Sequence, residues 1–301
     1  MKFIRLIISL LIIAALAAFL ILPKTKITPP QILKSIAKED VPKLYPYPVK
    51  VQNFRDTPQI SAKSAVVTDA KTGVTLFEKN SNSRQLPAST TKLMTALVAL
   101  EKCTPDQKVT VGAVEKEPTQ MGLATGDVVT VQALLYGLLI SSGNDAAYVL
   151  SYSCAPTTEQ FVSEMNQKAQ ELEMKNTHFA NPEGFDDPAE HTTARDLAKL
   201  ARVAVANPLI AKIVGTKSTV VTDVSGNKTY FLENINKLLG EVEGVEGIKT
   251  GQTALSLEIL ITKTTRDGNT ILTVILGSQD RFKESKALIE WAYANHQWIT
   301  P

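Results

Sequence analysis

Strand-like segments lie at both ends of the globular part of the chain. The segments 64–68 and 74–77 are rich in Val, Thr and Phe and flank a short turn that ends in glycine, which is typical of a β-hairpin. A second pair, 257–263 and 270–277, is rich in Ile, Leu and Thr and is joined by a polar turn. These patterns predict two hairpins that are far apart in the sequence.

Apolar residues with a helical period predict helices between these hairpins and after the second one. Leu93, Leu97 and Leu100 recur on one face of the segment 89–101. The same period is found in the segments 131–139, 144–151, 158–172, 194–206 and 283–296. Strands around a helical middle indicate an α+β fold in which both ends of the domain share one antiparallel sheet. No second domain is expected after the last helix.

The segment 1–23 has the pattern of a membrane anchor or a signal peptide. Lys2 and Arg5 precede an apolar run over 6–22 that only Ser9 interrupts. This length is at the lower edge for a spanning helix and above the usual core of a signal peptide. We expect an uncleaved single-pass anchor with an extracytoplasmic domain. The alternatives are secretion after cleavage at the Ala-Leu-Ala sequence at 15–17, and a helix buried in the protein core.

The segment 24–55 is punctuated by prolines at positions 29, 30, 42, 46 and 48. This composition predicts a stalk that holds the globular domain, residues 56–301, away from the membrane. Two cysteines, Cys103 and Cys154, lie in the exported part, where a disulfide and two separate buried thiols are both possible. Neither has a Cys or His at metal-ligand spacing, so no metal site is expected.

The composition is that of an ordinary globular protein. Apolar residues make up 44% of the chain and charged residues 21%, and the net charge is +2. A charge this small gives no reason to expect nucleic acid as a partner.

Ser89 and Lys92 are the candidate chemical pair. They are spaced i, i+3 at the start of the segment 89–101, after Pro87, so a helix beginning here would place both side chains on one face. A serine hydroxyl is a weak nucleophile until a base takes its proton, and a lysine whose pKa is lowered can be that base. The same pattern also describes a helix cap with a solvated lysine, so the pair alone is weak support.

Two further motifs strengthen this interpretation. Ser142 and Asn144 follow the apolar segment 131–139 in the sequence Ser-Gly-Asn, and Lys-Thr-Gly at 249–251 lies where the chain enters a strand. Each motif alone is an ordinary turn or loop-to-strand junction. In the order Ser-x-x-Lys, Ser-x-Asn, Lys-Thr-Gly they match the motifs of the penicillin-recognising serine enzymes.

The chain resembles the D-alanyl-D-alanine carboxypeptidases among the low-molecular-mass penicillin-binding proteins. The resemblance covers about residues 61–291 and rests, beyond the three motifs, on the segments 161–166, 176–184, 191–197 and 281–284. It implies a serine β-lactamase/transpeptidase-like fold that removes the terminal D-alanine of peptidoglycan stem peptides. It also implies that β-lactams acylate the same serine, and that no metal or cofactor takes part.

By this resemblance, Ser89 is the nucleophile that forms the acyl-enzyme and Lys92 is its general base. Ser142 relays protons to the leaving amine, and Asn144 holds the substrate amide or positions Lys92. The backbone N–H groups of Ser89 and Thr253 form the oxyanion hole.

The other residues implied to bind substrate lie on one strand and at the start of the last helix. Lys249, Thr250 and Gly251 line the strand and bind the substrate backbone and its terminal carboxylate. The charge of Lys249 is also expected to help keep Lys92 neutral. Arg281 matches the family arginine associated with that carboxylate. The alternative is a surface arginine that opens the last helix.

The sequence departs from the family pattern near the third motif. Ser256 and Leu257 stand where the family usually has Ala-Gly, which predicts altered packing beside the cleft, and Gln252 stands where relatives often have His or Tyr. The C-terminal β-rich domain and membrane helix of the family do not follow, so the N-terminal segment is expected to be the tether. The alternatives are a D,D-endopeptidase or weak β-lactamase at the same site, or a catalytically silent wall-binding protein.

Overall fold

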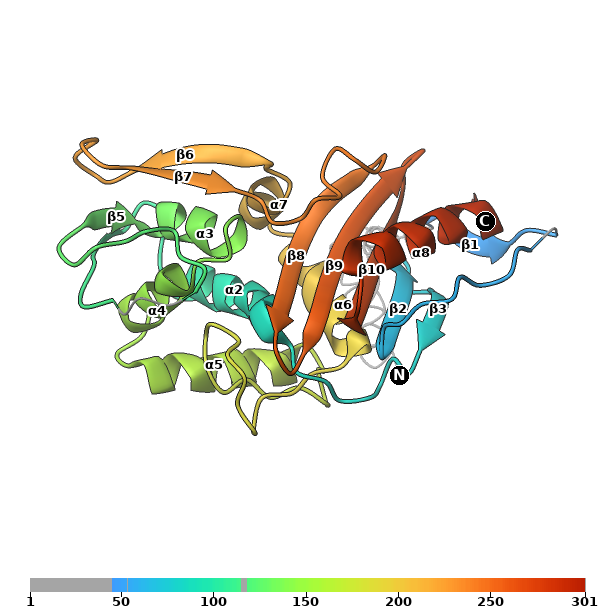
Figure 1. Ribbon diagram of the computed structural model, residues 1–301, viewed down its shortest axis with the longest axis horizontal. Helices are drawn as coiled ribbons and strands as arrows, with labels where there is room; N and C mark the ends of the chain where they lie inside the picture. The colour runs from blue at the N-terminus through green and yellow to red at the C-terminus, as the bar shows by residue number, and fades with distance from the viewer. Residues whose placement is uncertain (1–44, 53, 115–117, 301) are drawn as a thin grey trace, which may run out of the picture. The chain divides into compact units, whose positions relative to one another are not determined.

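Strands from both ends of the globular part meet in one antiparallel sheet (Figure 1). The computed structural model describes residues 45–52, 54–114 and 118–300. The sheet has the order β3-β2-β10-β9-β8. Its strands are β2 (Ser64–Asp69), β3 (Thr75–Lys79), β8 (Val245–Thr253), β9 (Leu257–Arg266) and β10 (Asn269–Ser278). The predicted α+β class is confirmed, and strand β8, which carries the Lys-Thr-Gly motif, lies at an edge.

Strand β10 is buried on both faces. Ile271 and Ile275 contribute to the core that includes helix α8 (Arg281–Asn295), whereas Leu272 and Val274 contribute to the core of the helical middle. Successive side chains of a strand point to opposite faces, so a strand covered by helices on both sides is apolar throughout. This explains why the segment 270–277 is a nearly continuous apolar run.

The helices of the middle follow the predicted periods closely. They are α2 (Lys92–Lys102), α3 (Val131–Leu139), α4 (Asn144–Ser153), α5 (Thr158–Glu171), α6 (Ala194–Ala204) and α7 (Pro208–Val214). Helices α3, α5 and α6 each follow a threonine whose hydroxyl accepts an N–H of the first turn, namely Thr130, Thr157 and Thr193. The short helix α7 was not predicted.

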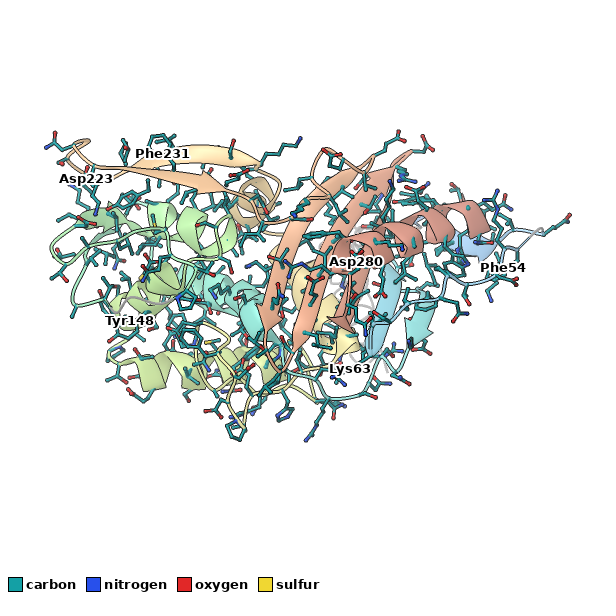
Figure 2. All side chains as sticks on the ribbon, viewed as in Figure 1. Phe54, Lys63, Tyr148, Asp223, Phe231 and Asp280 are labelled. Atoms are coloured by element: carbon teal, nitrogen blue, oxygen red, sulfur yellow. A yellow bond between two sulfur atoms is a disulfide. The ribbon has the colours of Figure 1, made fainter. Side chains whose placement is uncertain are left out.

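Three two-stranded sheets were not predicted either. They pair β1 (Tyr47–Lys50) with β11 (His296–Ile299), β4 (Lys108–Thr110) with β5 (Val128–Thr130), and β6 (Ser218–Thr222) with β7 (Thr229–Glu233). Strand β1 lies in the segment expected to be stalk, where Pro48 is compatible with a strand at a sheet edge. On the β6–β7 hairpin, Phe231 is 80% exposed (Figure 2).

The predicted anchor, residues 1–23, lies outside the described residues, and so does the stalk up to residue 44. Among the residues that are described, no helix combines the length and the apolar character needed to cross a bilayer.

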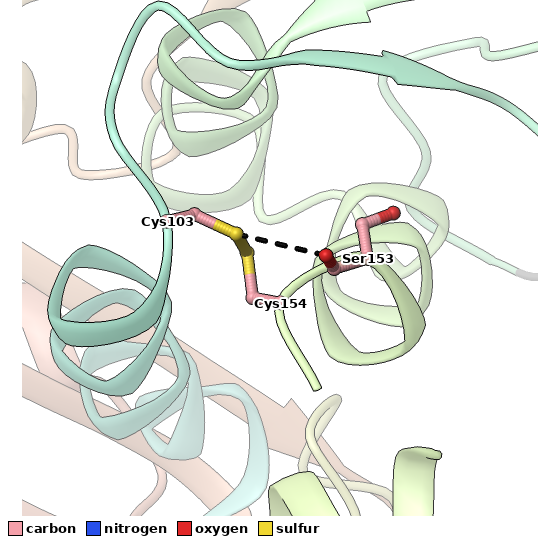
Figure 3. The surroundings of a disulfide bond; sticks show 3 residues. All are labelled: Cys103, Ser153 and Cys154. Atoms are coloured by element: carbon pink, nitrogen blue, oxygen red, sulfur yellow. Dashed lines mark hydrogen bonds between the residues drawn. A yellow bond between two sulfur atoms is a disulfide. The ribbon is translucent and has the colours of Figure 1, made fainter. Parts of the chain in front are cut away.

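Cys103 and Cys154 form a disulfide (Figure 3). Cys103 directly follows α2 and Cys154 directly follows α4, so the bond joins the C-terminal ends of these two helices. Of the two possibilities left open by the sequence, the structure shows the bonded one, with the Cα atoms 5.5 Å apart.

Replacing both cysteines by serine is expected to lower the free energy of unfolding by about 2–4 kcal/mol. The bonded residues are 51 apart in the sequence, and the entropy of closing such a loop in the unfolded chain sets the upper part of this range. Urea unfolding of the parent and the double variant measures the difference. The reduced parent is the matched control, and equal midpoints for the oxidised parent and the variant would contradict the expectation.

Candidate active site

The predicted nucleophile and base lie where the 3₁₀ turn η2 (Ala88–Thr91) passes into helix α2. Ser89 lies within η2 and is partly exposed, whereas Lys92 begins α2 and is fully buried. Lys92 Nζ donates to Ser89 Oγ over 3.0 Å, in keeping with the i, i+3 spacing. The preceding residue, Ala88, has a φ of +46°. Such left-handed backbone costs a non-glycine residue about 1–2 kcal/mol, and strain of this kind clusters at functional sites.

The Lys92 amine is held by two further oxygen atoms. Its Nζ lies 2.7 Å from Asn144 Oδ1 and 2.6 Å from the main-chain oxygen of Glu183. Burial lowers the pKa of Lys92 to about 7, while the carboxylates of Glu183, Asp145 and Glu190 act in the opposite direction. A large fraction of Lys92 is therefore neutral near neutral pH.

Ser142 lies in the turn between α3 and α4 and faces the interior. It is 3% exposed and has a φ of +60°, so this residue too is strained. Asn144 begins α4, and its Nδ2 donates to the Pro118 carbonyl at 2.6 Å. The side-chain amide of Asn144 is thus fixed on one side by Pro118 and on the other by Lys92.

Lys249 forms a second hydrogen-bonded pair beside the first. Its Nζ donates to Ser142 Oγ at 2.8 Å and to the Thr250 main-chain oxygen at 2.9 Å. Burial, followed by the charges of Lys92 and Arg281, holds the pKa of Lys249 well below its usual range. For Lys92, burial is the largest cause of the lowered pKa. Because the repulsion between two cations is mutual, a charged Lys249 also disfavours the protonated form of Lys92.

Strand β8 runs directly beside the nucleophile turn, by which we mean η2 (Ala88–Thr91) with Ser89 in it. A Cβ atom at Gly251 would lie 3.2 Å from Ala88 Cβ and 3.3 Å from Ser89 N. A larger residue at this position would therefore push the strand away from the turn. Thr250, one residue earlier, is 5% exposed.

The Thr253 N–H, predicted to face the cleft, is directed elsewhere. It donates to Ser256 Oγ at 2.9 Å, inside the β8–β9 hairpin, and the Thr253 hydroxyl donates to Asp186 Oδ1 at 2.8 Å. The N–H groups of successive strand residues point to opposite sides. The neighbouring Gln252 N–H therefore points to the open edge of β8, next to Gly251 and the nucleophile turn.

Arg281 begins helix α8, and its side chain reaches strand β8. Its Nη1 donates to the Gly251 main-chain oxygen at 2.9 Å, and its backbone N–H donates to Glu258 Oε2 at 2.9 Å. Only 7% of the residue is exposed, so it is not the surface arginine considered as the alternative. Figure 2 marks the start of this helix with Asp280.

The segment 181–184 supports the nucleophile turn and was not among the predicted site residues. The main-chain oxygen of Glu183 accepts from Lys92. Gly184 has a φ of +81°, and a Cβ there would lie 2.0 Å from the Ala88 main-chain oxygen, so glycine is required at this close approach. The family resemblance includes this segment, but the sequence does not reveal that one of its carbonyl groups points at Lys92.

A pocket of about 320 Å³ opens beside Asn144. Its other lining residues are Ala113, Val114, Asp145, Tyr148, Glu183 and Phe185. Tyr148, on α4 (Figure 2), and Phe185 are half-exposed and form apolar walls. The size is at the lower end of small-ligand pockets and is enough for one side chain of a peptide.

The site is built from Ser, Lys, Asn and Arg side chains. Within residues 45–52, 54–114 and 118–300, no group of three or more His, Cys, Asp and Glu side chains could hold a metal ion.

Leu257, which stands where the family usually has glycine, has a backbone conformation that suits glycine better than leucine. Its φ is +59°, the conformation that favours the glycine usual at this position, and its side chain is 38% exposed. Ser256 Oγ, by contrast, is buried in the hairpin and accepts from the Thr253 N–H. The Leu257 departure therefore strains the backbone of the hairpin turn.

A Leu257→Gly variant is expected to be more stable than the parent by about 0.5–1 kcal/mol. It removes the left-handed strain of about 1–2 kcal/mol, and the greater freedom of glycine in the unfolded chain offsets part of this gain. Urea unfolding measures the change. Leu255→Gly is the matched control, because Leu255 lies in the same turn, is 67% exposed and has no positive φ; it should not gain stability. A lower midpoint for Leu257→Gly would contradict the expectation.

Comparisons with known proteins agree with this geometry. A family model described as D-alanyl-D-alanine carboxypeptidase matches residues 51–280. D-alanyl-D-alanine carboxypeptidase DacF of Bacillus subtilis (strain 168) is 32% identical over 247 residues, which cover 78% of this chain and 63% of that protein. The D-alanyl-D-alanine carboxypeptidase of Streptomyces sp. (strain K15) is 35% identical over 239 residues, covering 73% of this chain and 82% of that protein.

The same likeness is found among solved structures. The crystal structure of the Streptomyces K15 DD-transpeptidase matches with a TM-score of 0.76 at 32% identity, covering 80% of this chain and 100% of that chain. The matched region thus spans less than two thirds of the Bacillus relative and all of the Streptomyces structure.

Proposed function

The chain belongs to the D-alanyl-D-alanine carboxypeptidase family, and we propose that it is a serine-type carboxypeptidase acting on peptidoglycan stem peptides. It removes the terminal D-alanine through an acyl-enzyme on Ser89, and β-lactams acylate the same residue. The observation that carries the proposal is the buried Lys92 amine, which is hydrogen-bonded to Ser89 and held at a lowered pKa.

Lys92 acts as the general base for Ser89. A neutral amine has two N–H groups and one lone pair. The carbonyl oxygens of Asn144 and Glu183 can only accept, so they occupy both N–H groups of the neutral amine. The lone pair then takes the place of the N–H that the protonated amine donates to Ser89 Oγ, 3.0 Å away, and can accept the proton of the Ser89 hydroxyl. Ser89 Oγ then attacks the carbonyl carbon of the penultimate D-alanine while its proton passes to Lys92 Nζ. Of the two roles expected for Asn144, these contacts favour positioning Lys92.

The oxyanion hole is formed by the N–H groups of Ser89 and Gln252. Thr253 was the sequence-based expectation for the second donor, but its N–H is used by Ser256. Gly251 approaches Ser89 N closely, which places the next N–H along β8 at the same opening. Donors fixed in advance at this point stabilise the charge of the tetrahedral intermediate.

Ser142 and Lys249 serve the leaving group. Lys249 donates to Ser142 Oγ, which orients the hydroxyl so that it can pass its own proton to the departing amine as the C–N bond breaks. Ser142 then takes back the proton that Lys92 received from Ser89, so that Lys92 is neutral again. Water then attacks the acyl-enzyme, with the base acting a second time.

Arg281, Lys249 and Thr250 bind the free carboxylate of the substrate. Arg281 uses Nη1 for the Gly251 carbonyl, and its buried Nε has no hydrogen-bond partner within the described part of the chain. An unsatisfied buried donor costs about 1–3 kcal/mol. The guanidinium lies against β8 at Gly251, so its positive charge would favour a substrate carboxylate at this strand, which is why a free terminus would be preferred.

We also propose that the segment 6–22 anchors the protein in the cell membrane with the catalytic domain outside the cytoplasm. The support is the apolar run between basic residues in the sequence. Anchoring would keep the cleft close to newly made peptidoglycan.

Intact-mass spectrometry of the full chain after penicillin, and D-alanine release from a pentapeptide, test the proposed function together. We expect one stoichiometric acyl adduct and steady release of D-alanine. Three further substrates compare the alternative activities. Cleavage of a crosslinked peptide dimer measures endopeptidase activity, hydrolysis of a chromogenic cephalosporin measures β-lactamase activity, and transfer to an amine acceptor measures transpeptidase activity. Binding to peptidoglycan with no adduct would instead identify a catalytically silent wall-binding protein.

A further inference from the structure

Glu190 is a buried carboxyl group that the proposed mechanism does not use. It is 2% exposed. Thr91, the residue before Lys92, donates its hydroxyl to Glu190 Oε1 at 2.7 Å, and the Ala180 N–H donates to Oε2 at 2.7 Å. The carboxyl group of Glu190 therefore connects the nucleophile turn with the loop between His178 and His191, which contains Ala180.

The loop that Glu190 holds is the one that supplies an acceptor to Lys92. Its two arms are joined by backbone hydrogen bonds between His178 and His191. Between these arms the chain passes through Ala180 to Glu183, whose main-chain oxygen lies 2.6 Å from Lys92 Nζ. A change at Glu190 is thus transmitted to Lys92 from two sides, through Thr91 and through this loop.

We propose that Glu190 is a positioning residue that fixes the Glu183 carbonyl against Lys92 and sets the pH at which Lys92 becomes able to act as a base. The inference rests on the proposed role of Lys92.

The charges around Lys92 support this assignment. The carboxylates of Glu183, Asp145 and Glu190 all favour its protonated form, and Lys249 is the nearby cation. Burial, with a smaller contribution from Asp187, raises the pKa of Glu190 to about 7, and hydrogen bonds from Ala180, Thr91 and Asn181 oppose that rise.

Glu190 and Lys92 consequently titrate in the same pH range. When Glu190 loses its proton, its new charge makes the loss of the Lys92 proton harder. Two groups coupled in this way give a broadened transition that belongs to the pair.

The test is the pH profile of acylation by a chromogenic cephalosporin, measured on the full chain. In Glu190→Gln, which removes the charge and keeps the size, the midpoint of the acidic limb should fall by about half a pH unit and the limb should become steeper. In Glu190→Asp, which keeps the charge and shortens the side chain, the midpoint should stay while the rate falls. This second variant keeps the inference testable should the glutamine variant not fold.

Asp196→Asn is the matched control. Asp196 is 3% exposed, accepts hydrogen bonds from Asn176 and Thr177 at the start of the same loop, and is not among the groups that shift Lys92. Its loss should leave the midpoint in place. Three outcomes would overturn this inference and leave the proposed function intact. They are an unchanged midpoint in Glu190→Gln, a shifted midpoint in Glu190→Asp, and a fall of the midpoint in Asp196→Asn as large as that in Glu190→Gln. Absence of any acylation of the parent would overturn the proposed function and this inference with it.

Discussion

A Ser89→Ala variant is expected to lose all covalent labelling by penicillin and to release D-alanine about 10⁴–10⁶-fold more slowly than the parent. The alanine variant lacks Ser89 Oγ, the hydroxyl oxygen that is hydrogen-bonded to the buried Lys92 amine. Without it, no acyl-enzyme can form, and only binding and charge stabilisation remain. Gel labelling with a fluorescent penicillin and an assay for free D-alanine measure the two losses.

Ser141→Ala is the matched control for this variant. Ser141 is close to Ser142 in the sequence, but its hydroxyl donates to the Gly137 carbonyl at 3.0 Å and contacts none of the proposed catalytic groups. It should label at the parent rate. A labelled Ser89→Ala protein would place the nucleophile elsewhere and refute the assignment.

The second large effect is expected from Lys92→Arg, which should slow acylation by about 10²–10⁴-fold. Arginine can donate hydrogen bonds as the protonated lysine does, but it does not lose its proton in a folded protein and so cannot provide the neutral form that acts as a base. The loss would therefore report on the base and not on the charge. Stopped-flow acylation by a chromogenic cephalosporin measures the rate constants, and Lys102→Arg, at the exposed end of the same helix, is the control.

The pH dependence of the parent belongs to the same test. Because burial places the pKa of Lys92 at about 7, the neutral form, and with it the acylation rate, should increase as the pH rises through about 7. Lys92→Arg should lack this limb. A parent rate that does not change between about pH 6 and pH 8 would mean that another group is the base.

The parts of the site that could be predicted depend on residues close together in the sequence. Ser89 and Lys92 are one helical turn apart, so their contact follows from the helix that their surroundings predict. Ser142 and Asn144 could be assigned because the turn they occupy follows a clear apolar helix. In the structure, hydrogen bonds connect Lys92 to Asn144 and Ser142 to Lys249.

What could not be predicted depends on direction and on contacts between distant segments. Whether the N–H of Thr253 or of Gln252 faces the cleft is set by which strand residues pair with β9, and the sequence of β8 alone does not reveal this. Glu190 contacts Thr91 across 99 residues of chain; Glu190 belongs to no motif, and Thr91 stands at a variable position of Ser-x-x-Lys. The prolines around Tyr47–Lys50 predict stalk, and the strand formed there depends on its partner β11 at the other end of the described residues, which the local sequence does not reveal.

The pairing of β2 with β10 has a consequence for how the chain must fold. The two strands join residues roughly 200 positions apart, such as Val66 and Val274, and pairing over such distances is slow. If the protein crosses the membrane with its N-terminus first, β2 emerges long before its partner. Until β10 arrives, β2 is paired with β3 alone and its other edge is open, and an open apolar edge is a template for aggregation. The last part of the chain to arrive would therefore close the central sheet, and a protein interrupted before β10 would be a misfolding hazard and not a partial enzyme.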